Sequence, residues 1–223
     1  MPDSNSKNKK ASIKILKDGP YLAKGVKNFK NSKDVTIPSK PVMTLCRCGK
    51  SSNKPFCDGT HTNINFNGDK DKNHIPHKVE IYKGEKITIY DNRSVCSHRG
   101  YCTDELPSVW RSEKEPWIDQ DGASVEEIIK ICEKCPSGAL SYSLRDGERI
   151  QDVKRRDEAI FIAPRRYNAD GPYDITGGVK MEDLDGASPE SKEHYTLCRC
   201  GASKNKPFCS GEHWYVKFID NDN

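Results

Sequence analysis

Apolar and polar positions alternate in short runs along much of this chain, and glycine and proline interrupt the runs. Near the N-terminus, three such runs predict short strands, at 12–16, 21–26 and 41–45. Residues 78–92 contain two alternating runs on either side of a Lys-Gly-Glu-Lys turn, which predicts a β-hairpin. The pattern therefore favours small, strand-rich units.

One segment has helical periodicity instead. Ser124 and Glu127 have the spacing of a capping box, in which the serine hydroxyl and the glutamate carboxylate each accept a hydrogen bond from a backbone N–H. Pro136, directly after Cys135, is expected to end the helix. Four side chains of this helix fall on one face: Val125, Ile128, Ile129 and Cys132.

The composition indicates that packing alone does not hold these units together. The chain has 223 residues, of which 34% are hydrophobic and 31% charged, and small domains bury little apolar surface. The 37 basic and 33 acidic residues are interspersed, so the charge favours neither nucleic acid nor a membrane as a partner. Bound metal or disulfides are expected to stabilise each unit.

The ten cysteines point to bound metal. No window approaches the roughly 20 apolar residues that cross a bilayer, and residues 1–16 lack the features of a signal or transit peptide. The cytoplasm is therefore the expected compartment. Thiols stay reduced there, which favours metal ligands over disulfides.

A long internal repeat organises the cysteines. At an offset of 152, residues 44–61 match residues 196–213 at 14 of 18 positions, and the sequence Asp-Gly-Pro-Tyr at 18–21 recurs at 170–173. Because one offset holds over some fifty residues, we interpret the two arms as copies of a whole domain.

Each copy contains the ligand spacing Cys-x-Cys-x8-Cys-x3-His. Three cysteines and a histidine can hold zinc or an iron-sulfur cluster, but zinc sites usually pair ligands as Cys-x2-4-Cys. A two-iron cluster needs two ligand pairs, and Cys46 with Cys48 and Cys57 with His61 can supply them. A short helix opening at 54–61 is expected to bring Cys57 and His61 onto one face.

The first copy resembles the CDGSH iron-sulfur (NEET) family, whose pattern C-x-C-x2-S/T-x3-P-x-C-D-G-S/A/T-H it matches at every position. The second copy has Ser210 and Glu212 in place of the aspartate and the small residue, and loses no ligand. The resemblance implies one redox-active 2Fe-2S cluster per copy, with the histidine-bound iron near solvent. The implied ligands are Cys46, Cys48, Cys57 and His61 in the first copy and Cys198, Cys200, Cys209 and His213 in the second.

A third cysteine group lies between the copies, with the pattern Cys-x5-Cys-x29-Cys-x2-Cys-Pro. Residues 79–145 resemble the divergent 4Fe-4S mono-cluster family, and by position the resemblance implies three ligands: Cys96, Cys102 and Cys135. Arg99 stands where a standard Cys-x2-Cys-x2-Cys loop has its second cysteine. The cluster is then either 3Fe-4S, or 4Fe-4S completed by Cys132 or His98, and Cys132 can equally be a small buried core residue.

These observations predict a small multi-domain α+β protein, with two β-rich CDGSH-type domains forming a pseudo-twofold pair and a ferredoxin-like α+β domain inserted between them. The expected segments are a flexible tail at 1–10, a first CDGSH domain at 11–76, the ferredoxin-like domain at 77–147, a connector at 148–158 and a second CDGSH domain at 159–223.

We expect an electron-transfer protein and not an enzyme, since no catalytic fingerprint is found. It would carry two 2Fe-2S clusters and one 4Fe-4S or 3Fe-4S cluster. Its partner would be a redox protein or an apo iron-sulfur protein, and the internal pair would let a monomer serve as a dimer does. The alternatives are cluster storage, cluster transfer or redox sensing, and a zinc-stabilised interaction module.

Overall fold

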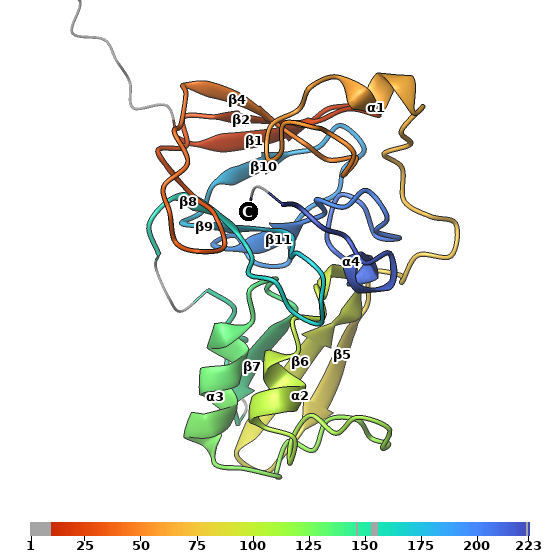
Figure 1. Cartoon of the computed structure of the whole chain (residues 1–223). Coiled ribbons are helices and arrows are strands. Elements are labelled where there is room, and N and C mark those ends of the chain that lie inside the picture. The colour runs from red at the N-terminus through yellow and green to blue at the C-terminus, as the bar shows by residue number, and fades with distance from the viewer. Residues whose placement is uncertain (1–9, 146, 153–155, 222) are drawn as a thin grey trace, which may run out of the picture.

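The computed structural model describes residues 10–145, 147–152, 156–221 and 223, and three small β-sheets organise it (Figure 1). Two four-stranded sheets contain the strands of the repeated copies, and a three-stranded sheet with two helices forms the middle domain. The chain is thus β-rich with few and short helices, as the α+β prediction required. No helix of the described segments is long and apolar enough to traverse a bilayer.

The strands of the two copies are short, and the three strands predicted near the N-terminus are present. The first copy contributes β1 (Ser12–Ile15), β2 (Tyr21–Lys24), β3 (Asn28–Lys30) and β4 (Val42–Leu45). The second contributes β8 (Ala159–Ile162), β9 (Tyr173–Thr176), β10 (Lys180–Glu182) and β11 (Tyr195–Leu197).

The two copies exchange a strand. The sheet order is β10-β1-β2-β4 in one sheet and β11-β9-β8-β3 in the other. β10 of the second copy pairs in parallel with β1, and β3 of the first copy pairs in parallel with β8. Each sheet therefore depends on backbone hydrogen bonds from the other copy, which repeats separated by the middle domain can form only after the chain has folded back.

Reciprocal side-chain contacts reinforce this pairing. The Tyr21 hydroxyl donates to the carbonyl oxygens of Cys198 (2.8 Å) and Pro207 (3.2 Å). The equivalent Tyr173 donates to the carbonyls of Cys46 (3.1 Å) and Pro55 (3.0 Å). Both rings are fully buried and contact each other edge to face at 6.1 Å. Each tyrosine, which ends the repeated Asp-Gly-Pro-Tyr sequence, thus anchors the cysteine loop of the opposite copy.

The middle domain contains the predicted hairpin, β5 (Val79–Lys83) and β6 (Ile87–Asn92), and β7 (Leu140–Leu144) pairs antiparallel with β6. A 3-10 turn, η1 (Arg93–Val95), follows β6, and two helices, α2 (Tyr101–Glu105) and α3 (Val125–Lys134), lie beside the sheet.

The predicted helix is α3, and its N-terminus has the predicted capping box. The backbone N–H of Glu127 donates to Ser124 Oγ, and the Ser124 N–H donates to the Glu127 carboxylate. Ile128, Ile131 and Cys132 are buried, so the apolar face of the helix packs in the core.

The short helix expected to open at 54–61 is shifted along the chain. It is α1 (Thr60–Asn63), and its counterpart in the second copy is α4 (Glu212–Tyr215). Residues 55–57 instead pair with β4: Cys46 N–H donates to the Pro55 carbonyl, and Cys57 N–H donates to the Thr44 carbonyl. The expectation of a helix containing Cys57 was therefore wrong, because these backbone groups extend the sheet.

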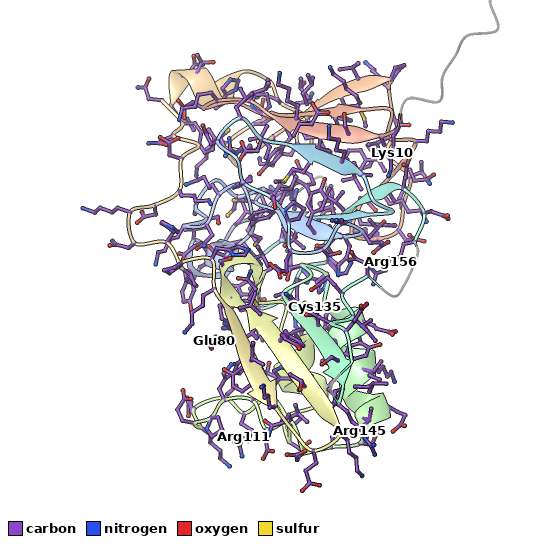
Figure 2. All side chains as sticks on the ribbon, turned by 180° about the vertical axis from the view of Figure 1, so that it is seen from behind. Lys10, Glu80, Arg111, Cys135, Arg145 and Arg156 are labelled. Atoms are coloured by element: carbon purple, nitrogen blue, oxygen red, sulfur yellow. The ribbon has the colours of Figure 1, made fainter. Side chains whose placement is uncertain are left out.

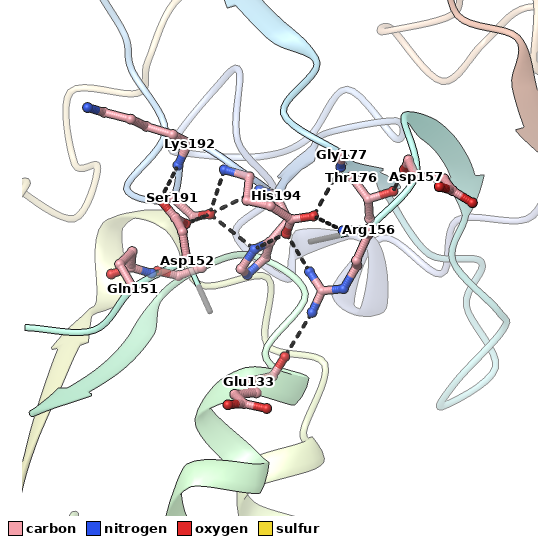
Figure 3. A network of polar contacts seen from close by, with 12 residues as sticks. Glu133, Gln151, Asp152, Arg156, Asp157, Thr176, Gly177, Ser191, Lys192 and His194 are labelled. Atoms are coloured by element: carbon pink, nitrogen blue, oxygen red, sulfur yellow. Dashed lines mark hydrogen bonds and ion pairs between the residues drawn. The ribbon is translucent and has the colours of Figure 1, made fainter. Parts of the chain in front are cut away.

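The segment 190–194 of the second copy binds the middle domain through a polar network (Figure 3). The Arg156 guanidinium donates to Glu193 Oε2 at 2.8 Å and to the Glu133 carbonyl, at the end of α3, at 2.9 Å. The Glu193 carboxylate also accepts from the backbone N–H of Gly177. Burial lowers the pKa of the adjacent His194, and the charge of Arg156 adds to this effect.

Part of the expected connector takes part in these contacts. Arg149 donates to Glu190 at 2.6 Å, and Ile150 forms a β-bridge with Tyr142. Residues 153–155 of that connector, and residues 1–9 of the expected tail, lie outside the described part of the chain.

Candidate iron-sulfur sites

The four predicted ligands of the first copy lie together as two pairs. Cys46 Sγ is 3.8 Å from Cys48 Sγ, and Cys57 Sγ is 3.3 Å from His61 Nδ1. β4 leads directly into Cys46, and His61 is on the first turn of α1. The loop between these elements folds back on β4, which brings the two pairs to one end of the sheet.

The second copy repeats this geometry. Cys198 Sγ is 3.8 Å from Cys200 Sγ, and Cys209 Sγ is 3.4 Å from His213 Nδ1. The His213 Nε2 atom is buried and has no hydrogen-bond partner among the described residues.

Both distances fit two donors on one tetrahedral metal. Two thiolates about 2.3 Å from a shared ion lie about 3.8 Å apart, and a thiolate and an imidazole nitrogen lie about 3.5 Å apart. Two such pairs per copy suit the two irons of a 2Fe-2S cluster, with Cys-Cys ligation at one iron and Cys-His ligation at the other.

Close approach also changes the acidity of the thiols. The hydrogen bond from Cys46 lowers the pKa of Cys48 to about 6, and the hydrogen bond from Cys200 lowers the pKa of Cys198 to about 6. The same hydrogen bond and then burial raise the pKa of the other member of each pair, and the negative charge of its neighbour adds to this effect. A cation that neutralises both sulfurs would remove this conflict.

Backbone groups surround the third cysteine of each copy in the same way. The N–H groups of Gly59 and Gly211 lie 3.5 Å from the sulfurs of Cys57 and Cys209 and donate to them. Both glycines are left-handed, with φ of 91° and 80°, a conformation that glycine adopts without a Cβ clash. The glycine therefore aims its amide at the ligand sulfur.

Ser210, which replaces the aspartate of the motif, keeps a hydrogen bond to a backbone N–H within the loop. In the first copy, the Asp58 carboxylate accepts from the backbone N–H groups of Ser52 (2.8 Å) and Thr60 (3.0 Å). Hydrogen bonds from Thr60, followed by those from Ser52, hold the pKa of Asp58 well below its usual range. In the second copy, Ser210 Oγ accepts from the N–H of Lys204 at 3.1 Å. The loop contact remains, and one negative charge is absent.

The two histidines have different surroundings. His61 is half-buried, whereas His213 is 2% exposed. Burial, together with the positive charges of Arg99 and Arg199, lowers the pKa of His213 to about 4. Arg99 belongs to the middle domain, and its guanidinium donates to the carbonyl of Pro164 in the second copy at 3.2 Å.

The ligand loops of the two copies touch each other. A methyl group added at Gly49 would lie 2.4 Å from the carbonyl oxygen of Cys200, and one added at Gly201 would lie 2.4 Å from that of Cys48. Glycine at these two positions is therefore required for the backbones to approach. The sequence signal was their recurrence at the 152-residue offset, although the repeat did not reveal that each faces the other copy.

The second loop also touches the middle domain. A methyl group at Gly211 would lie 3.0 Å from His98 Nδ1. Trp214, next to His213, packs edge to face on Tyr167 at 5.0 Å, and both rings line a cavity of the middle domain. The three cysteine groups consequently form a contiguous row, from the first copy through the second to the middle domain.

That cavity has a volume of about 670 Å³ and brings three predicted ligands together: Cys96, Cys102 and Cys135. Cys135 lies at the end of the middle domain that faces the paired copies, and Arg145 lies at the far end (Figure 2). Burial raises the pKa of Cys96 and of Cys102 to about 12 each. Each thiol therefore needs a bound cation to ionise at neutral pH.

Cys132 and His98 differ in their position relative to this cavity. Cys132 is 3% exposed, packs in the hydrophobic core and is not among the residues that line the cavity. His98 does line it, but its Nε2 lies 3.1 Å from the Arg93 guanidinium and its Nδ1 faces Gly211. Cys132 therefore lies near Cys102 and Cys135 but in the core, and not among the residues that line the cavity.

Asp91 also lines this cavity, although it was not among the site residues predicted from the sequence. Its side chain is 1% exposed, and burial raises its pKa to about 6. Asp91 follows Ile87 and Ile89 at alternate positions of β6, so a charged residue on the core face of a predicted strand was the available signal.

Comparisons with known proteins cover the three segments that contain these residues. The family described as "Iron-binding zinc finger CDGSH type" matches residues 18–62 and 170–214, and the family described as "Divergent 4Fe-4S mono-cluster" matches residues 82–145. No solved structure matches the chain significantly.

Two curated relatives are proteins of Escherichia coli, from strain K12 and from O157:H7, both described as "Uncharacterized protein YjdI". Each is 39% identical to this chain over 61 residues, which are 27% of this chain and 80% of the relative. The two family matches, the repeated motif and the paired geometry of the candidate ligands identify the chain as a member of the CDGSH iron-binding family, with two CDGSH-type domains on either side of a divergent 4Fe-4S mono-cluster domain.

Proposed function

We propose that this protein is a one-electron carrier that holds two 2Fe-2S clusters in its CDGSH-type domains and one 4Fe-4S or 3Fe-4S cluster in its middle domain. When bound, such clusters supply reversible one-electron redox chemistry. The chain would act on a redox partner and would not itself transform a small-molecule substrate.

The row of touching ligand loops carries this proposal. Gly49 and Gly201 let the two CDGSH loops meet, and Gly211 lets the second loop meet His98 of the middle domain. Metal that only stabilised separate folds would not require the loops that carry the candidate ligands to approach one another. Contact between them suits electron passage within one molecule.

The ligand sets also argue against a zinc module. Each CDGSH-type copy presents donors as two separate pairs, whereas a zinc ion draws four donors around one point. All ten cysteines are free, which fits metal ligation in a reducing compartment such as the cytoplasm.

Cluster delivery is the second candidate, and the first copy favours it. Cys57 and His61 are both partly exposed, and a methyl group at Gly59 would meet no atom within 4 Å. An acceptor protein could therefore approach the Cys57-His61 pair directly, which the covered second copy does not allow.

The deciding experiment uses the full chain isolated without oxygen. Electron carriage predicts iron and acid-labile sulfide in the protein, reversible bleaching by dithionite and full recovery on oxidation. After incubation with an apo-ferredoxin and separation of the two proteins, the visible absorbance of the clusters should remain with this protein. Rapid transfer of absorbance to the acceptor would favour delivery, and colourless protein with stoichiometric zinc would overturn both redox functions.

A further inference from the structure

The carboxylate of Asp91 is buried and is only partly compensated by its neighbours. It lies on the same face of β6 as Ile87 and Ile89, and all three side chains are at most 1% exposed. Neither of its oxygens accepts a hydrogen bond of normal geometry from the described residues, and burial raises its pKa in spite of the nearby Arg93 charge and Trp117 side chain. A buried carboxylate is unfavourable unless a cation or hydrogen-bond donors compensate it, so a cation bound in the cavity would stabilise the charged form of this group.

The nearest guanidinium is engaged elsewhere. Arg93 donates to His98 Nε2 at 3.1 Å, and its guanidinium carbon lies 4.7 Å from the centre of the Trp117 ring, on which it stacks. Arg93 attracts Asp91 through its charge, but no hydrogen bond joins the two side chains. The carboxylate therefore remains available to a cation in the cavity.

Asp91 shares this cavity with the three clustered cysteines. It is near the end of β6, and Cys96 directly follows the η1 turn after that strand. Its cross-strand partners are Glu80 on β5 and Leu140 on β7, and Leu140 comes soon after Cys135. Both flanking segments thus place Asp91 at the end of the sheet where the cysteines gather.

The other possible fourth ligands fit less well. Cys132 does not line the cavity, and the two ring nitrogens of His98 face Arg93 and Gly211. The hydroxyl of Ser97 is buried, unpartnered and on the cavity wall, but it is neutral and must lose a proton to become an anionic ligand. A carboxylate is already an anionic oxygen donor of the kind that binds iron.

We propose that Asp91 is the fourth ligand of the middle cluster, which makes the site a 4Fe-4S site of three cysteines and one aspartate. The inference rests on the proposed function in one respect only, namely that the middle domain binds a cluster. Because a carboxylate binds iron less tightly than a thiolate does, the iron at this corner is the one expected to be lost first, leaving a 3Fe-4S cluster.

The test is EPR of the oxidised full chain after anaerobic reconstitution with iron and sulfide. Oxidised 2Fe-2S and 4Fe-4S clusters are EPR-silent, whereas an oxidised 3Fe-4S cluster has one unpaired spin, so the outer clusters do not interfere. The wild type should be silent. Asp91→Asn should show about one spin per chain and about one iron fewer, and Asp91→Cys should be silent again.

Matched variants test the rival ligands. Ser97→Ala, His98→Ala and Cys132→Ser should all remain silent with unchanged iron content. An oxidised Asp91→Asn protein that is silent and has the iron content of the wild type would overturn the assignment, as would a wild type that keeps the 3Fe-4S signal in excess iron.

Two further outcomes are also decisive. If Asp91→Asn loses the whole middle cluster, the Mössbauer spectra of the wild type and of Asp91→Cys are compared instead. A distinct iron site in the wild type that becomes thiolate-like in Asp91→Cys would support Asp91 as a ligand. Identical spectra would overturn the assignment. Absence of acid-labile sulfide from the wild type would instead overturn the proposed function itself.

Discussion

The two CDGSH-type copies have the same candidate ligands in the same geometry, and they differ in what covers these residues. In the first copy, Cys57 and His61 are partly exposed; in the second, Cys209 and His213 are each 2% exposed. The motif therefore sets the arrangement of the candidate ligands, and the neighbouring domain sets how accessible each site is to solvent and to partner proteins.

The difference arises because the middle domain docks on one copy. Segment 190–194 of the second copy forms the buried network with Arg156, whereas the equivalent segment of the first copy, 38–42, is exposed. His98 and Arg99 then cover the second ligand loop. We expect the exposed copy to exchange electrons or metal with partners and the covered copy to communicate with the middle domain.

Acid should separate the two copies most strongly. A proton competes with iron for imidazole, and burial disfavours the protonated form of a histidine. The pKa of His213 is lowered to about 4, so the folded protein resists protonating it. At about pH 5, the second copy should therefore lose its cluster about tenfold more slowly than the first, which would be seen as two phases in the decay of visible absorbance.

The sign of the stability effect follows from the same shift. Between about pH 6.5 and about pH 4, the unfolded chain binds a proton at His213 and the folded chain does not, so the contribution of this group to stability falls as the pH falls. His61→Cys should remove the fast phase and His213→Cys should affect only the slow phase. A single phase in the wild type would contradict the difference between the copies.

Removing Glu193 should release the second copy from the middle domain. Glu193→Ala leaves the Gly177 N–H without its acceptor and removes one of the two acceptors of the Arg156 guanidinium, and the carboxylate side chain is only 11% exposed. The expected loss is about 2 kcal/mol of unfolding free energy, measured by denaturant titration. The control Glu182→Ala, which breaks an exposed ion pair with Lys180, should cost less than about 1 kcal/mol.

Alanine at the two equivalent loop glycines provides a direct comparison. Gly59→Ala and Gly211→Ala both place a Cβ on a left-handed residue, at a cost of about 1–2 kcal/mol. Only Gly211→Ala also crowds His98, so it should destabilise the protein by about 1 kcal/mol more. Adding His98→Ala should remove that excess; equal effects of the two single variants would mean that the loop contact is not close.

Exchanging the residues after the third cysteine should have the smallest effect. Asp58→Ser removes a negative charge beside the first site and retains an acceptor for the Ser52 N–H, as Ser210 does for Lys204. The reduction potential of the first CDGSH cluster should rise in Asp58→Ser, because reduction adds negative charge and a nearby negative charge has been removed. Ser210→Asp should lower the reduction potential of the second CDGSH cluster for the same reason. Redox titration monitored by EPR would measure both, and shifts of the same sign would contradict an electrostatic cause.

Local sequence signals predicted much of the fold. The hairpin of β5 and β6 followed from alternation, and α3 began at its capping box because Ser124 and Glu127 interact over one turn. The ligand pairs followed from spacing and from the repeat. The helix at Cys57 was misplaced, because the pairing of residues 55–57 with β4 depends on a strand that is distant in sequence.

The sequence by itself determined the three ligand groups, their pairing in each copy and the elements that present them, since these depend on residues a few positions apart. Only the tertiary structure decided the strand exchange of β3 and β10, the burial of His213, and the position of Asp91 among the clustered cysteines. These features join segments that are far apart in the chain, or place a side chain in surroundings that such segments build, and no local pattern of residue types specifies them.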